Sequence, residues 1–170
     1  ILTPTHGYLE NTIASMRASF AAGADIVELD VHPTTDGEFA VFHDWTLDCR
    51  TNGQGVTREQ SMVELGKLDI GYGYFRGKGI GLMPTLREVL HEFPGRRFLI
   101  NVKSNDAIEG TKLSTFLNGL DPSTRKMLMV YGGDRPIAAL RAAAPDLQSM
   151  SRSSLKACLL RYIAVGWSGM

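Results

Sequence analysis

The sequence predicts an α/β fold in which helices alternate with parallel strands. Short apolar runs alternate along the chain with longer segments of helical periodicity, and this alternation is typical of the βα units that build a parallel sheet. Three of the apolar runs end in polar residues. Parallel α/β folds hold their active sites at that end of their strands. The pattern alone fits both a doubly wound sheet and a closed barrel.

Size and composition favour one domain with a buried core. The chain has 170 residues, of which 44% are hydrophobic and 21% are charged. Its 18 basic and 18 acidic residues cancel, so no net charge favours a nucleic acid or an anionic membrane as a partner. No apolar run reaches the roughly 18 residues of a transmembrane segment, and no leader peptide is visible. Cys49 and Cys158 lack metal-site spacing, which indicates two free or buried thiols.

The chain opens with a predicted helix and a strand. Apolar residues recur at helical spacing over residues 9–22. Asn11 or Thr12 can cap this helix, and Gly23 ends it. The β-branched residues of 25–31 then predict a strand.

A hairpin and a long irregular segment follow. Residues 35–38 read Thr-Asp-Gly-Glu, a turn signal, and 39–42 form the returning strand. Residues 44–83 are rich in glycine and carry few periodic signals. A segment of this length is uncommon inside a compact domain and favours a functional insertion. The alternative is a surface excursion without a role.

Regular elements resume after the insertion. Pro94 and Gly95 separate the first helix from the next strand, and Pro136 lies in the first turn of a later helix. The expected helices span 85–93, 107–120, 136–144 and 155–165, and the expected strands span 97–103, 127–131 and 147–150.

Three polar residues of the first strand share one face. Glu28, Asp30 and His32 are spaced two apart, so their side chains point the same way. Two carboxylates at the end of an apolar strand are costly unless their charge is compensated. A divalent cation with oxygen ligands would compensate it. A salt-bridged or solvated carboxylate pair is the alternative.

The end of the returning strand carries a candidate acid–base group. His43 ends the strand that pairs with the strand of Glu28 and Asp30, so we expect it near those carboxylates. An imidazole has the proton affinity for acid–base work near neutrality. The alternative is a structural histidine that hydrogen-bonds a loop.

Asn101 and Lys103 share one face of a later strand. A lysine on the inner face of a parallel strand needs an anionic partner, which a phosphate or a carboxylate can supply. The alternative is an ion pair with Glu28 or Asp30. Carboxylates, a histidine and a lysine at strand ends together indicate metal-assisted phosphoryl chemistry.

Ordered motifs resemble the glycerophosphodiester phosphodiesterase family. The segment 9–15 is similar to the family's Pro-Glu-Asn-Thr signature, and the match covers roughly residues 7–105 in order. The further matching segments are 23–31, 36–37, 41–44, 46–48, 51–55, 84–90 and the strand of Lys103.

The resemblance implies a TIM (β/α)8 barrel of the phospholipase-C-like phosphodiesterase type, with an insertion after the second strand. Residues 44–83 stand where that insertion belongs. It also implies hydrolysis of a small-molecule phosphodiester, a glycerophosphodiester, to glycerol 3-phosphate and an alcohol. Residues 1–170 would form one incomplete barrel domain.

The resemblance also implies roles for single residues. Glu28 and Asp30 match the family's ligands for Mg²⁺ or Ca²⁺, and Asn101 stands at the position of a third, a glutamate. His43 matches one of two acid–base histidines. The lysine that faces the phosphate matches Lys103, and Glu10 matches the signature glutamate near the metal and the substrate.

Three departures limit the match. The family's first-strand His-Arg-Gly is missing, since His6-Gly7 lies too close to Glu10 and lacks the arginine. Asn101 replaces a glutamate. About five strand–helix units are present against eight in a closed barrel, so we expect the first and last strands to lie outside this sequence. The rival functions are a lysophospholipase D or sphingomyelinase D-like enzyme on the same scaffold, and a non-catalytic phosphodiester-binding relative.

Overall fold

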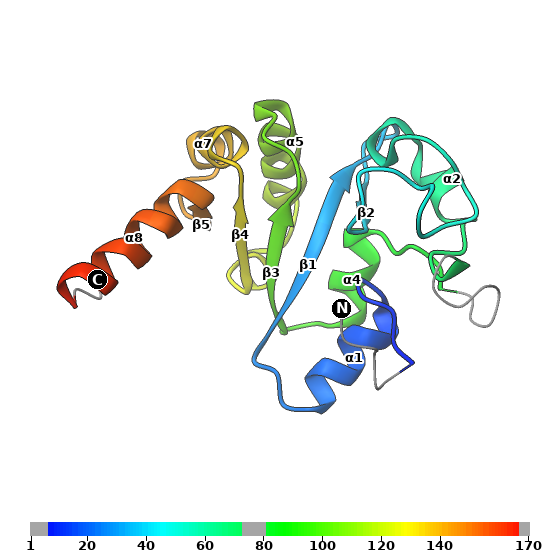
Figure 1. Ribbon diagram of the computed structural model, residues 1–170, viewed down its shortest axis with the longest axis horizontal. Coiled ribbons are helices and arrows are strands. Elements are labelled where there is room, and N and C mark those ends of the chain that lie inside the picture. The colour runs from blue at the N-terminus through cyan, green and yellow to red at the C-terminus, as the bar shows by residue number, and fades with distance from the viewer. Residues whose placement is uncertain (1–6, 73–80, 167–170) are drawn as a thin grey trace. The chain divides into compact units, whose positions relative to one another are not determined.

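The computed structural model describes residues 7–72 and 81–166. These residues form two compact units, one within Ile1–Arg96 and one within Arg97–Met170, and Figure 1 shows the elements of each. His6 and residues 73–80 of the predicted insertion lie outside the described residues. No helix of the described part is long and apolar enough to cross a membrane. The single domain over 1–170 stays a prediction.

The first unit is built on a β-hairpin. Strands β1 (Ile26–Pro33) and β2 (Phe39–Val41) pair antiparallel, with Val31 opposite Val41. Gly37 takes the left-handed φ of 88° that the turn needs. The predicted turn and both predicted strands are confirmed.

Asp36 ties this turn to the insertion. Its carboxylate accepts a hydrogen bond from the Thr34 hydroxyl at 2.5 Å and from the Met62 backbone N–H at 2.9–3.0 Å. These two donors, the hydroxyl first, hold the pKa of Asp36 below its usual range. The carboxylate therefore anchors the first residue of a short helix to the hairpin.

Helix α1 (Ile13–Ala21) begins four residues later than predicted. Of the two candidate caps it uses Thr12, whose hydroxyl accepts the Ser15 N–H. Asn11 instead takes a left-handed conformation, with φ 59°. Because this conformation breaks the helical path, residues 9–12 lie outside the helix.

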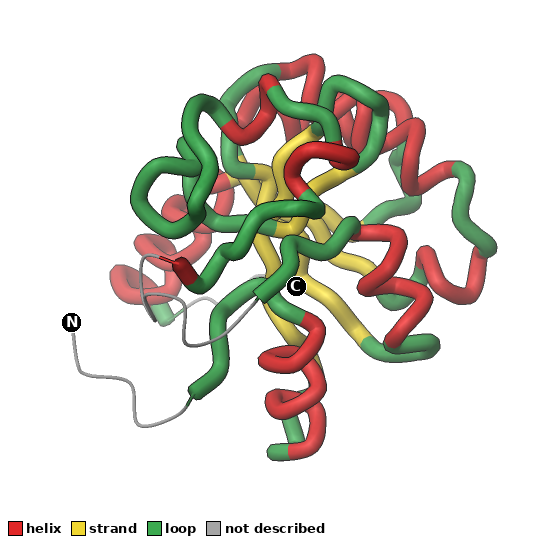
Figure 2. The backbone as a smooth tube through the Cα atoms, turned by 90° about the vertical axis from the view of Figure 1, so that its right-hand side faces the viewer, coloured by secondary structure: helices red, strands yellow, loops and turns green. Residues whose placement is uncertain are grey.

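The insertion shares a buried apolar cluster with the end of the hairpin. Loops make up most of the chain between β2 and α4 (Leu86–Glu92), and short helices such as the 3-10 helix η1 (Thr57–Glu59) and α2 (Met62–Leu65) interrupt them (Figure 2). Its buried apolar side chains pack together with Ala40 of β2 and with Phe42, which directly follows β2; the cluster is Ala40, Phe42, Leu47, Met62, Leu65, Ile70 and Met83. The insertion is therefore a packed substructure, which removes the alternative of a loose surface excursion for its described residues.

The second unit is a parallel three-stranded βα array. Strands β3 (Arg97–Val102), β4 (Leu128–Gly132) and β5 (Gln148–Ser151) pair in sequence order, and both pairings are parallel. This confirms the predicted parallel βα units. The helices between and after them are α5 (Ala107–Asn118), α6 (Pro122–Arg125), α7 (Asp134–Ala143) and α8 (Arg152–Val165).

Helices α5 and α7 pack closely because of one glycine. A Cβ on Gly110 would lie 2.0 Å from the Pro136 carbonyl oxygen, so only glycine permits this approach. The short α6 was not predicted. It consists of one turn, capped by Asp121 with Pro122 at its first position.

Candidate functional site

His43 and Asp44 form a hydrogen-bonded pair after β2. The chain reaches them through Phe42, whose backbone N–H donates to the Asp30 carbonyl at 3.1 Å, while the expected closeness of His43 to the carboxylates of Glu28 and Asp30 stays a prediction. His43 Nδ1 lies 2.7 Å from Asp44 Oδ1. The histidine side chain is 45% exposed. An ionised carboxylate only accepts, so Nδ1 donates and Nε2 is left to exchange protons.

Arg50 extends this pair to the N-terminal segment. Its Nε lies 2.9 Å from Asp44 Oδ2, and its Nη1 contacts Glu10 Oε1. The arginine side chain is only 17% exposed. One guanidinium therefore bridges the carboxylates of Glu10 and Asp44, and the substrate role of Glu10 stays a prediction from the resemblance.

Arg50 and Asp44 were not among the predicted site residues. Arg50 directly precedes the Thr-Asn-Gly of a matched motif. That adjacency, in a glycine-rich segment following His43, is the signal that could have identified Arg50. Asp44 is the last residue of the matched segment 41–44, and that motif is the signal that could have identified it.

The insertion folds back to hold the backbone of Asp44. The hydroxyl of Thr57 donates to the Asp44 carbonyl at 2.9 Å, and its N–H donates to the Trp45 carbonyl at the same distance. Thr57 is fully buried. Satisfied buried hydrogen bonds of this kind rigidify a loop, so the backbone that carries the Asp44 carboxylate is held in place.

Asp30 is held by Asn11. The Asn11 amide donates from Nδ2 to Asp30 Oδ2 at 3.0 Å, and Asn11 Oδ1 accepts the Asp30 backbone N–H at 3.0 Å. Both residues are buried. Because Asn11 fixes the direction of the Asp30 carboxylate, this side chain offers a carboxylate oxygen in a defined position as a possible cation ligand on β1.

The other two polar residues of β1 differ in surroundings. Glu28 is exposed, whereas His32 is fully buried and meets the ring of Trp45 edge-on at 5.5 Å. His32 therefore packs as part of the interior.

Glu28 and Asp30 supply hard carboxylate oxygens, which are the ligands that Mg²⁺ and Ca²⁺ take in proteins. The described residues contain no group of three or more His, Cys, Asp or Glu side chains placed to hold a metal.

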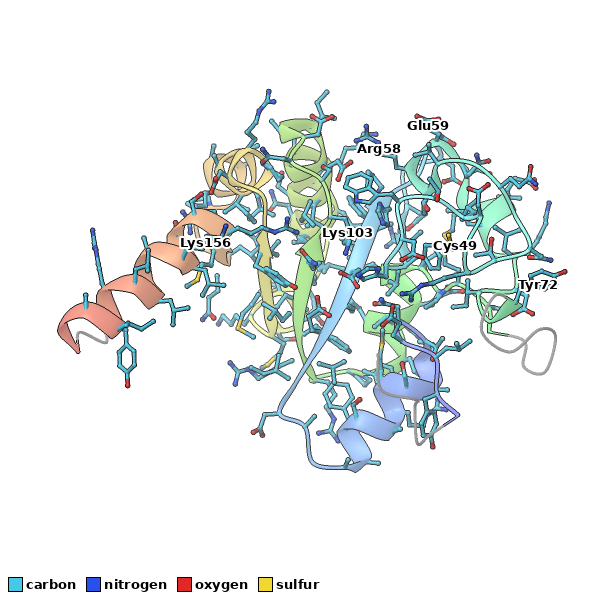
Figure 3. The ribbon with its side chains drawn as sticks, in the orientation of Figure 1. Cys49, Arg58, Glu59, Tyr72, Lys103 and Lys156 are labelled. Atoms are coloured by element: carbon cyan, nitrogen blue, oxygen red, sulfur yellow. The ribbon has the colours of Figure 1, made fainter. Side chains whose placement is uncertain are left out.

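Asn101 and Lys103 belong to the second unit. Asn101 is buried on β3 opposite Tyr131, and Lys103 follows the strand, half-buried (Figure 3). Their assignments to a metal and a phosphate stay predictions from the resemblance. Cys49 and Cys158 are both free, as predicted.

A separate groove lies between the helices of the first unit. Its volume is about 660 Å³. The lining residues include Ile13, Leu82, Met83, Pro84 and His91. None of the site residues, Glu10, Asn11, Asp30, His43, Asp44 and Arg50, lines it.

Comparison with known sequences decides the family. The profile of the glycerophosphoryl diester phosphodiesterase family matches residues 4–135, a span that contains every residue of the site described above. The chain belongs to this family. The resemblance of its ordered motifs is thereby confirmed.

Curated relatives carry the same name or a related one. A glycerophosphodiester phosphodiesterase of Caldanaerobacter subterraneus subsp. tengcongensis is 40% identical over 102 residues, which is 58% of this chain and 41% of the relative. A human lysophospholipase D is 31% identical over 131 residues, covering 73% of this chain and 40% of that protein. The chain thus spans about 40% of the length of these relatives.

Solved structures share the fold. A glycerophosphodiester phosphodiesterase from Agrobacterium tumefaciens superimposes with a TM-score of 0.72 at 27% identity, over 83% of this chain and 60% of that one. An Oleispira antarctica phosphodiesterase in complex with the product sn-glycerol-3-phosphate gives 0.70 at 22% identity, over 84% and 60%. The TIM-barrel-type α/β fold is confirmed by this likeness.

Proposed function

We propose that this chain carries part of the catalytic centre of a phosphodiesterase that hydrolyses glycerophosphodiesters to glycerol 3-phosphate and an alcohol. The observation that carries the proposal is the 2.7 Å hydrogen bond between His43 and Asp44, which leaves the other edge of a half-exposed imidazole for the substrate. Family membership and the product held by the Oleispira antarctica relative support the same reaction.

His43 would move the proton of the reaction. With Nδ1–H held by Asp44, Nε2 either accepts a proton from the attacking hydroxyl or donates one to the leaving alcohol oxygen. The attacking group is water, or a glycerol hydroxyl of the substrate followed by water. In both cases the bond from phosphorus to the alcohol oxygen breaks and the phosphomonoester remains.

Glu28 and Asp30 would hold a divalent cation, Mg²⁺ or Ca²⁺. Their hard oxygens fit either ion, and Asn11 already fixes the direction of the Asp30 carboxylate. When bound, such a cation offsets negative charge on the phosphoryl oxygens. Mg²⁺ sites of one or two carboxylates are commonly completed by waters and substrate phosphate.

The reaction is tested with glycerophosphocholine and the full chain, followed by ³¹P NMR in the presence of Mg²⁺ or Ca²⁺. Glycerol 3-phosphate should appear in the wild type and be lost in His43→Ala. A transient cyclic glycerol phosphate would identify the substrate hydroxyl as the attacking group. Binding of glycerophosphocholine without any turnover would overturn the proposal in favour of a non-catalytic relative.

A lysophospholipase D is the second candidate, because the human relative of that name covers 73% of this chain. An enzyme of this kind needs an apolar groove beside its catalytic groups for the acyl chain. The groove of the first unit is lined by none of the site residues, so this groove gives the candidate no support. Release of lysophosphatidic acid from lysophosphatidylcholine faster than glycerol 3-phosphate from glycerophosphocholine would favour it.

A further inference from the structure

We infer that Arg50 is a positioning residue that fixes the carboxylate of Asp44 and thereby sets which ring nitrogen of His43 carries the proton. The inference deepens the proposed function and rests on it only where turnover is the measurement. Its structural part concerns three side chains in contact, His43, Asp44 and Arg50.

The two oxygens of Asp44 have different partners. Oδ1 meets His43 Nδ1 at 2.7 Å, and Oδ2 meets Arg50 Nε at 2.9 Å. A carboxylate turns easily about its last bond, because that torsion has a broad and shallow profile. A partner on each oxygen stops this rotation and keeps Oδ1 directed at the imidazole.

Arg50 is itself held on both sides. Its side chain is mostly buried, its Nη1 contacts Glu10, and the next residue, Thr51, bonds the Leu47 carbonyl through its N–H at 3.0 Å and its hydroxyl at 2.8 Å. These bonds close a turn that fixes the backbone from which the guanidinium extends. The Arg50 guanidinium is therefore held in one position between the carboxylates of Glu10 and Asp44.

The chemistry of this position requires arginine. A planar guanidinium donates in several fixed directions, so one group can serve two carboxylates at once. A lysine ammonium is a compact charge on a flexible stem and lacks that fork. Without any cation, the carboxylates of Glu10 and Asp44 would repel each other across the space that Arg50 fills.

The consequence falls on the tautomer of His43. A neutral imidazole carries its proton on either nitrogen, and the hydrogen bond made by one nitrogen decides the choice. While Asp44 Oδ1 faces Nδ1, the Nδ1–H form is favoured and Nε2 accepts. If Asp44 rotates away, the two forms mix and fewer molecules present Nε2 ready for the substrate.

The tautomer can be measured directly by long-range ¹H–¹⁵N NMR of histidine-labelled full chain at about pH 8.5, above the ordinary imidazole range. Wild-type His43 should show mainly the Nδ1–H form. Arg50→Met should show a mixture of both forms and lower kcat at least about tenfold, with KM within about twofold. Arg50→Lys should give a tautomer ratio and a kcat between those of wild type and Arg50→Met, because lysine keeps the positive charge but lacks the several fixed donors of a guanidinium.

Arg125→Met is the matched control. Arg125 is also mostly buried, with 19% of its side chain exposed against 17% for Arg50, and it pairs with Asp146 in the second unit. It should leave the tautomer of His43 and kcat unchanged. An equal effect of Arg125→Met and Arg50→Met would reduce the role of Arg50 to general stability and overturn the inference.

Two further variants keep the test decisive. Asp44→Asn alone should change the tautomer ratio of His43. Adding Arg50→Met to that variant should cause no further change, because Arg50 acts through Asp44. Should Arg50→Met fail to fold, Glu10→Ala removes one anchor of the guanidinium and should shift the tautomer in the same direction. An unchanged Nδ1–H form in a folded Arg50 variant refutes the inference even if hydrolysis is present. Absence of hydrolysis in the wild type refutes the proposed function but leaves the tautomer result intact.

Discussion

Asn11 and Asp30 exchange two hydrogen bonds of opposite direction, although 19 residues separate them. The amide of Asn11 donates to the carboxylate and accepts from the backbone of the same residue. Asn11 reaches this position only because its backbone is left-handed, with φ 59°, a conformation that asparagine tolerates better than most residues. The segment before α1 is thereby locked to β1 beside a candidate metal ligand.

The first prediction separates the backbone and side-chain roles of Asn11. Asn11→Gly tolerates the left-handed φ but loses both bonds, which should cost about 1–3 kcal/mol of the free energy of unfolding. Asn11→Ala should cost roughly 1 kcal/mol more, because alanine is strained at this φ. Urea denaturation of both variants measures the two effects.

Metal affinity gives the functional half of the same prediction. Both Asn11 variants should bind Mg²⁺ or Ca²⁺ more weakly than wild type in a calorimetric titration, by similar factors. Asn118→Ala is the control, because its amide bonds only a helix carbonyl in the second unit. Unchanged metal affinity in Asn11→Gly would show that Asp30 needs no orientation from this amide.

The second prediction concerns the cation. Exhaustive chelation should abolish hydrolysis, and added Mg²⁺ or Ca²⁺ should restore it. Asp30→Asn should need far more metal for half-maximal activity, since affinity follows the charge of the ligands. Asp25→Asn is the control, an exposed carboxylate just before β1, and should titrate like wild type. Full activity in metal-free protein would remove the cation from the mechanism.

The strands and the position of His43 were predictable because they follow from local patterns. Alternation and β-branching mark β1, and the Asp-Gly turn returns the chain so that His43 ends beside it. The bridge from Arg50 to Asp44 and Glu10 was not predictable. It spans 40 residues to Glu10 and depends on loop geometry for which no periodic signal exists.

Asn11 shows a second limit of local patterns. As a polar residue before a helix it fitted the role of a cap, and Thr12 fitted equally well. Only the long-range bond to Asp30 decides between them. Helix α6 differs, since Asp121 followed by Pro122 is a local signal of a helix start, and this helix was therefore predictable from the sequence.

The third prediction is a pH dependence of stability at Asp36. Its pKa is lowered in the folded chain below the ordinary 3.8, mainly by the Thr34 hydroxyl and next by the Met62 N–H. A lowered pKa stabilises the fold above the ordinary value, and this contribution is lost as pH falls through the lowered one. The stability difference between wild type and Asp36→Asn should therefore be constant near pH 6 and shrink below about pH 4.

Thermal melts between about pH 6 and pH 2.5 follow this difference. Thr34→Val removes the strongest donor to the carboxylate, so it should shift the loss toward higher pH. A difference between wild type and Asp36→Asn that stays the same down to the lowest pH would show that Asp36 gains nothing from its two donors.

The fourth prediction tests His43 as the acid–base group. His43→Ala should lower the turnover of glycerophosphocholine by at least about a hundredfold, the usual scale for a lost general acid or base. The melting temperature should change little, because the side chain is 45% exposed and its pair with Asp44 lies near the surface. His91→Ala, an exposed histidine of α4, should keep wild-type turnover. Imidazole added to His43→Ala should restore part of the rate, since a free base can enter the space of the lost ring, whereas the same addition should leave His91→Ala unaffected.

Near-normal turnover by His43→Ala would assign the proton transfer to another group and leave the His43–Asp44 pair with a structural role.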